Sequence, residues 1–124
     1  MIIQQDLTYY GNLGSKKVHT LFDSGATISC ISEKVIKGLE KPNKLFKPIE
    51  IGTAAVGTML KINHYVVLWF DLEGHHLSDI FFIIPTLNAD VVIGVDTLQK
   101  YHCKLDFKKG KVIVDPNAGK LMLM

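Results

Sequence analysis

The sequence has no arginine, although 14 of its 124 residues are basic. All of the basic residues are lysine, and against 12 acidic residues they leave a formal net charge of only +2. Arginine is the side chain best suited to bidentate hydrogen bonding with phosphates and base edges. Its absence therefore argues against a protein dedicated to nucleic-acid recognition.

Long hydrophobic runs are also missing. The longest uninterrupted apolar runs cover residues 65–70 and 80–84, whereas a helix that spans a bilayer needs about 20 apolar residues. The N-terminus lacks the basic start and the apolar stretch of a secretory signal peptide. We therefore expect no membrane partner and, if the natural protein begins at this methionine, a cytoplasmic location.

Cysteine is scarce, with only Cys30 and Cys103 in the chain. Two cysteines without Cys-x-x-Cys spacing form neither a disulfide framework nor a zinc or redox motif, so free buried thiols are expected. The five histidines show no ligand spacing on one element. The adjacent pair His75-His76 would point to opposite faces of a strand. We expect no metal and no cofactor.

What the sequence does contain is a series of short β-type segments separated by turn signals, typical of a small barrel or sandwich. The two segments on either side of Glu73-Gly74 should pair as a long hairpin. Ser32 predicts the start of a short helix at 33–39, and Asp96 with Gln99 resembles a capping box for a second helix that continues to about 102. The expected strands are 17–22, 28–31, 49–51, 60–71, 76–84, 91–93 and a hairpin over 104–114 that turns at Lys109-Gly110.

Asp23-Ser24-Gly25 places an acid between an apolar strand and a glycine. The carboxylate must leave the strand at a tight turn, where glycine allows a close backbone approach. A buried lone aspartate is costly, so this site needs hydrogen-bond donors or a second carboxyl that shares a proton. Taken alone, the tripeptide is equally compatible with an ordinary turn or helix cap.

A second motif, Val92-Ile93-Gly94-Val95-Asp96, follows further along the chain. In order, spacing and flanking segments, the pair resembles the retropepsin-like aspartic proteases, and the likeness extends over about 17–114. The Gly-x-Asp sequence in the second motif is closer to the cellular and retrotransposon members than to the retroviral enzymes.

This resemblance implies a mainly β, closed acid-protease barrel with a flap hairpin and one or two short helices, in which residues 1–124 form one domain and one half of a two-fold dimer. It also implies an aspartic endopeptidase that cleaves extended peptides without a cofactor. Because the chain holds only one Asp-Ser-Gly, the second catalytic carboxyl must come from another copy. The implied catalytic residues are Asp23, Ser24 and Gly25, and the implied substrate-binding residues are Leu21, Ala26, Thr27, Ile28, Val92 and, in the flap, Val56.

Several features depart from the retroviral pattern. Retroviral members pair an acid with an arginine across the two motifs, and here those positions hold Thr27 and Val95. Ser24 stands where threonine is commoner. The chain ends are apolar enough to pair in an interfacial sheet, as in retroviral relatives, or to fray.

Two alternatives to the enzyme are open at this stage. One is a dimeric peptide-binding or scaffolding module that keeps the fold without turnover. The other is a small β-barrel that binds an apolar ligand, which would account for the hydrophobic strands but not for the two motifs.

Overall fold

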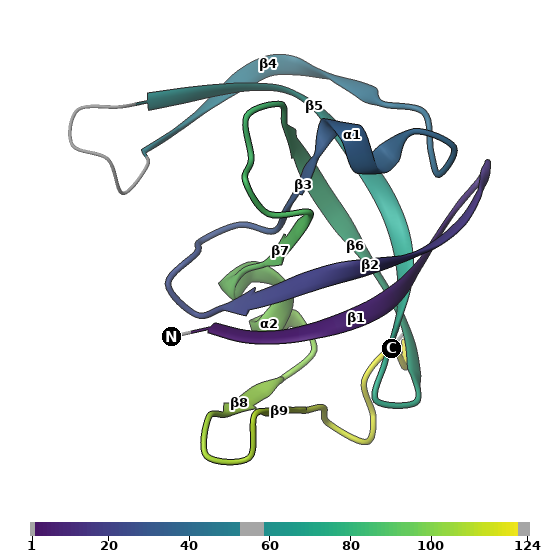
Figure 1. The fold of residues 1–124 in the computed structure, drawn as a ribbon, viewed down its shortest axis with the longest axis vertical. Coiled ribbons are helices and arrows are strands. Elements are labelled where there is room, and N and C mark those ends of the chain that lie inside the picture. The colour runs from purple at the N-terminus through teal and green to yellow at the C-terminus, as the bar shows by residue number, and fades with distance from the viewer. Residues whose placement is uncertain (1, 53–58, 122–124) are drawn as a thin grey trace.

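The computed structural model describes residues 2–52 and 59–121, which fold mainly into β-strands (Figure 1). Two short helices lie between strands along the chain. The elements are β1 (Ile2–Gly11), β2 (Gly14–Asp23), β3 (Cys30–Ser32), α1 (Glu33–Ile36), β4 (Asn43–Gly52), β5 (Met59–Leu72), β6 (His75–Ile84), β7 (Val91–Ile93), α2 (Val95–Lys100), β8 (Lys104–Asp106) and β9 (Lys111–Ile113).

The strands close into a barrel. The hydrogen-bonded order is β1-β2-β7-β3-β6-β5, and β1 pairs with β5 to complete the ring, while β4 is attached to the outside edge of β5. Most neighbours are antiparallel, but β2 with β7 and β3 with β6 are parallel. The expected class, a mainly β closed barrel with short helices, is confirmed.

The first strand was not expected from the sequence. Every second side chain along its centre points inward, and Ile3, Leu7 and Tyr9 are buried. β1 pairs with β2 along its whole length, from Ile2 opposite Asp23 to Gly11 opposite Gly14. The N-terminal segment therefore pairs within its own chain.

Both predicted hairpins are present. In the longer one, Leu72 lies opposite His75, and the two turn residues between them, Glu73 and Gly74, have φ of 48° and 80°. Positive φ at both central residues is the geometry of the turn that matches strand twist. The shorter hairpin joins β8 to β9, and Gly110 has φ of 64° at its turn.

The predicted start of α1 at Glu33, with Ser32 before it, is confirmed, but the predicted capping contact and the predicted end of this helix are wrong. Ser32 occupies the N-cap position of α1 but its side chain makes no capping hydrogen bond, and α1 ends at Ile36 rather than near residue 39. Asp96 lies inside α2, whose N-cap is Gly94. Its carboxylate accepts the N–H of Thr97 at 2.7 Å in the first turn of the helix, and it also binds a residue from another part of the chain, as described below.

The barrel interior holds the main core, where aromatic rings pack edge to face. The Tyr9 and Phe81 ring centroids lie 5.8 Å apart, and those of Phe70 and Phe81 lie 5.9 Å apart. A second apolar cluster surrounds Val92 and Ile62 between β7 and the β4–β5 hairpin. Within the described part of the chain, neither helix has the length and apolar character needed to cross a bilayer.

Candidate active site

Asp23 is the last residue of β2, where the chain leaves the barrel wall. The backbone N–H of Gly25 donates to Asp23 Oδ1 at 2.8 Å, and the N–H of Ala26 donates to the Asp23 carbonyl at 3.1 Å. Ser24 and Gly25 are exposed, whereas Asp23 is half-buried. One carboxylate oxygen is therefore fixed by a tight turn, and the turn itself faces outward.

The loop that follows Asp23 rests on the start of α2. The N–H of Val95 donates to the carbonyl of Ala26 at 2.8 Å. The next N–H, from Asp96, donates to the carbonyl of Thr27 at 3.2 Å. The first N–H groups of a helix have no partner inside it, so here the loop that follows Asp23 supplies their acceptors.

Gly94 makes this close approach possible. A Cβ at this position would lie 2.4 Å from the carbonyl oxygen of Ile28 and 2.8 Å from that of Ala26. Both obstacles are backbone atoms, which cannot move aside as a flexible side chain could. A glycine is therefore required where the loop passes over the end of β7.

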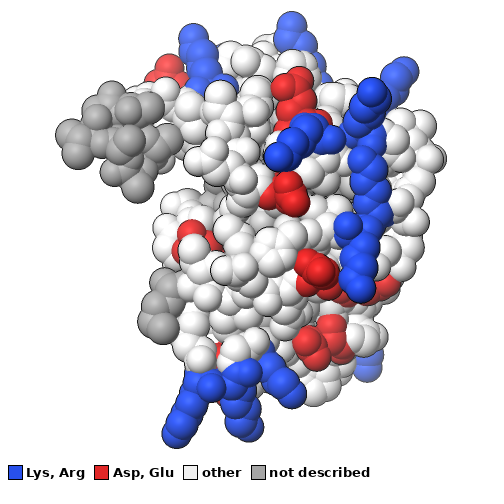
Figure 2. All heavy atoms as spheres, in the orientation of Figure 1, with Lys and Arg blue, Asp and Glu red and all other residues white. Residues whose placement is uncertain are grey.

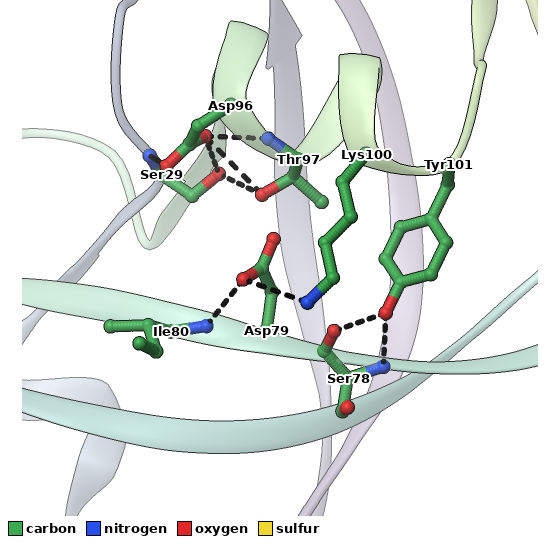
Figure 3. Close-up of polar contacts among 8 residues, drawn as sticks. All are labelled: Ser29, Ser78, Asp79, Ile80, Asp96, Thr97, Lys100 and Tyr101. Carbon is green, nitrogen blue, oxygen red and sulfur yellow. Dashed lines mark hydrogen bonds and ion pairs between the residues drawn. The ribbon is translucent and has the colours of Figure 1, made fainter. Parts of the chain in front are cut away.

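A polar network that the sequence analysis did not find joins the same two segments (Figure 3). Ser29, fully buried at the end of the loop, donates its N–H to Asp96 Oδ2 at 3.2 Å and its hydroxyl to Asp96 Oδ1 at 3.0 Å. The Ser29 hydroxyl also lies 2.6 Å from that of Thr97 and accepts the N–H of Gly94 at 3.0 Å. The sequence feature that could have indicated this network is Gly94-Val95-Asp96, because it places a carboxylate next to the glycine that contacts the loop.

Cys30 begins β3 directly after this loop and is buried. Burial, followed by the nearby carboxylates of Asp96 and Asp23, raises the pKa of its thiol to about 11. The thiol is therefore neutral at ordinary pH and is a poor nucleophile. Among the described residues, no group of three or more His, Cys, Asp or Glu side chains could hold a metal ion.

A sequence profile of the family described as retroviral aspartyl protease matches residues 12–120. The chain belongs to this family. The match includes both motifs and all of the loop between Asp23 and β3.

Two solved structures share the fold of the retroviral aspartyl proteases with this chain. One is the retroviral protease-like domain of Ddi1 from Leishmania major, with a TM-score of 0.69, 18% identity, and coverage of 94% of this chain and 90% of that one. The other is EIAV protease complexed with the inhibitor HBY-793, with a TM-score of 0.62, 17% identity, and coverage of 86% of this chain and 94% of that one. No curated protein sequence matches.

Most of the family's expected substrate-binding positions lie together in this chain. Leu21, Ala26, Ile28 and Val92 belong to one apolar cluster, in which Val92 is buried and the others are half-buried. Thr27 is exposed and outside that cluster. Val56 lies outside the described residues, between the paired ends of β4 and β5.

The acid and arginine that retroviral members carry are Thr27 and Val95 in this member of the family. Their backbones do lie at the contact between the loop and α2, but an ion pair is impossible for these side chains. The carboxylate at this contact is supplied instead by Asp96, from the helix, and its partner is the loop serine, Ser29. A side-chain contact between the loop and α2 is therefore present in this chain too, but the acid lies on the helix and its partner lies on the loop.

Proposed function

We propose that this protein is an aspartic endopeptidase that acts as a homodimer, with one Asp23 carboxyl from each copy. The observation that supports this most strongly is a single half-buried carboxylate on a rigid turn, in a chain of the retroviral aspartyl protease family. Peptide hydrolysis by carboxyl groups needs two of them. A second copy related by a two-fold axis would supply the other.

The proposed reaction uses two carboxyls about 3 Å apart that share one proton. The ionised carboxyl accepts a proton from water, which attacks the scissile carbonyl, while the protonated one donates a hydrogen bond to the carbonyl oxygen. Two carboxylates this close cannot both be ionised, so they titrate as a pair. No cofactor takes part in this scheme.

The surface beside Ser24 supports a partner copy. An apolar groove of about 690 Å³ runs from Ser24 past Leu98 to Leu105 and Phe107. Phe107 is partly exposed at its end. If the Asp23 residues of two copies met, both grooves would lie next to the two-fold axis, where a second copy could cover them.

The substrate would be an extended peptide, paired as an added strand and with alternate side chains in pockets. The apolar cluster that contains Leu21, Ala26, Ile28 and Val92 would form the walls of these pockets. We therefore expect apolar residues on both sides of the cleaved bond. Thr27 would contribute at the rim, because its side chain is exposed.

In the view of Figure 2, lysines lie at the lower end of the molecule, along its right flank and on its upper edge. Four of them, Lys104, Lys108, Lys109 and Lys111, belong to the β8–β9 hairpin. The apolar lining, rather than charge, would then govern which peptides bind at the proposed site.

The test is cleavage of a diverse peptide library between pH 4 and 7 by the wild type and by Asp23→Asn, which keeps the size of the side chain. We expect cleavage by the wild type, none by the variant, and loss of specific activity on dilution as dimers dissociate. Cleavage by both proteins, or a fully active monomer in sedimentation, would refute the proposal. Peptide binding without cleavage would identify the alternative, a non-catalytic binding module.

A further inference from the structure

The loop from Ser24 to Ser29 carries the proposed catalytic turn at one end and enters β3 at the other. Its middle is held by the two backbone hydrogen bonds from α2. The carbonyl of its last residue, Ser29, accepts the N–H of Phe82 from β6 at 3.1 Å, and the Ser29 N–H and hydroxyl are bound by the side chain of Asp96. Asp96 accepts the N–H and the hydroxyl of Ser29 and also the N–H of Thr97, at 2.7 Å.

These contacts leave no spare hydrogen-bonding capacity at Ser29. Its hydroxyl has one proton, donated to Asp96, and two lone pairs, which accept from Gly94 N–H and from the Thr97 hydroxyl. Removing the Asp96 carboxylate would leave the buried Ser29 N–H without an acceptor, and would leave the Thr97 hydroxyl as the acceptor for the Ser29 hydroxyl proton. Buried groups without partners are costly, so the loop would have to rearrange.

From this geometry we propose that Asp96 is a positioning residue for peptide cleavage, which acts through Ser29 to hold the Asp23 loop in its reactive arrangement. The inference rests on the proposed function. The three hydrogen bonds that Asp96 accepts from Ser29 and Thr97 are made within one chain, so they do not need a second copy. Loss of the Asp96 carboxylate should therefore impair turnover and substrate binding without weakening the dimer.

An asparagine at position 96 is the sharpest probe. It has nearly the same shape, but it has one acceptor oxygen where the carboxylate has two, and its amide would place N–H protons against the N–H of Ser29. Asp96 itself is exposed, so the variant should still fold. Charge-assisted hydrogen bonds such as these are stronger than neutral ones, which makes the loss measurable.

The same helix provides a matched control at its other end (Figure 3). There Lys100 Nζ lies 3.6 Å from Asp79 Oδ1, and the Tyr101 hydroxyl donates to the Ser78 carbonyl. Asp79→Asn also turns a carboxylate into an amide and also loosens α2 from its neighbour. The Asp79 carboxylate contacts Lys100 and the N–H of Ile80 in its own strand, rather than the loop that carries Asp23.

The experiment compares the wild type, Asp96→Asn and Asp79→Asn on one cleaved peptide, at enzyme concentrations where sedimentation shows each to be fully dimeric. We expect kcat/KM to fall roughly 10- to 100-fold for Asp96→Asn, as for other small misplacements of catalytic groups. We expect Asp79→Asn to stay within about twofold of the wild type. The double variant Asp96→Asn with Ser29→Ala should lose no more activity than the worse single variant, because both changes remove one contact.

Unchanged kcat/KM in Asp96→Asn would overturn the inference and leave the proposed function standing. Equal losses in the two asparagine variants, or multiplicative losses in the double variant, would overturn it too, since a general loosening of α2 would then explain the effect. A wild type that cleaves no peptide would refute the proposed function itself, and the role of Asp96 in catalysis with it.

Discussion

Gly94→Ala should damage the protein at one identifiable point, the crossing of the Asp23 loop over the end of β7. The added Cβ would lie 2.4 Å from the Ile28 carbonyl oxygen, where van der Waals contact requires well over 3 Å. Overpacking against backbone costs up to about 3 kcal/mol. Relieving the clash also strains the hydrogen bond from Val95 N–H to the Ala26 carbonyl, which contributes about 1 kcal/mol.

A loss of about 3 kcal/mol corresponds to a fall in Tm of roughly 12 °C for a domain of this size. Urea unfolding followed by tryptophan fluorescence and a thermal melt would measure it. Cleavage should fall further than the folded fraction accounts for, because the displaced segment carries Asp23. A free energy of unfolding within about 0.5 kcal/mol of the wild type would refute the packing argument.

Gly11→Ala is the control, because its Cβ would lie 2.0 Å from the carbonyl oxygen of Leu39. This clash is also with backbone. It lies at the far end of the β1–β2 hairpin from Asp23, roughly 30 Å along the strand. We expect a comparable loss of stability, with the folded molecules retaining wild-type turnover. Equal loss of turnover in both variants would show that the effect of Gly94→Ala is not local.

Three other measurements follow from the structure. Because the pKa of the Cys30 thiol is raised to about 11, the folded protein keeps a proton that an unfolded thiol releases above about pH 8.5. Stability should therefore fall as the pH rises between these values, and Cys30→Ala should reduce this dependence in urea titrations at pH 7 and 10. Part of the dependence should persist, because burial also raises the pKa of the Cys103 thiol to about 11. Tyr9→Phe removes the buried hydrogen bond of 2.8 Å to the Thr20 hydroxyl and should cost about 1–2 kcal/mol in urea unfolding, whereas no change would mean that Thr20 is satisfied by its backbone acceptor alone. Hydrogen bonds from Tyr10 and His76 lower the pKa of Asp71. This carboxylate therefore stabilises the fold above its unfolded pKa, and the stabilisation is lost as the pH falls. Asp71→Asn should slightly weaken the fall of the unfolding free energy at acid pH, and an unchanged fall would contradict this role of Asp71.

The long hairpin could be predicted because its information is local. Alternating apolar residues on both arms and a turn that needs positive φ at Glu73 and Gly74 are visible in the sequence. β1 has the same alternation, but Gln5 occupies an inward position between Ile3 and Leu7. One polar residue in the pattern was enough to hide the strand, which is fixed by pairing with β2 rather than by its own composition.

The turn at Asp23 was visible because its residues are contiguous. Gly94 was visible as part of the second motif, but its close approach to the Ile28 carbonyl was not. The Ser29–Asp96 contact was hidden for the opposite reason. Asp96 just before Thr97 looks like a local helix cap, and only the packing of the loop against α2 brings Ser29 within 3.0 Å of its carboxylate. The same carboxylate accepts hydrogen bonds from its local partner, the N–H of Thr97, and from this distant one.

The pairing of Ile2 with Asp23 has a practical consequence for anyone engineering this protein. A polypeptide fused ahead of Ile2 would emerge beside Asp23 and could block a peptide or a second copy of the chain from reaching this carboxylate. The C-terminal segment instead runs to the β5–β6 turn, where a Cβ on Gly119 would lie 3.1 Å from Leu77 (Figure 1). Affinity tags, fluorophores and surface tethers therefore belong at the C-terminal end.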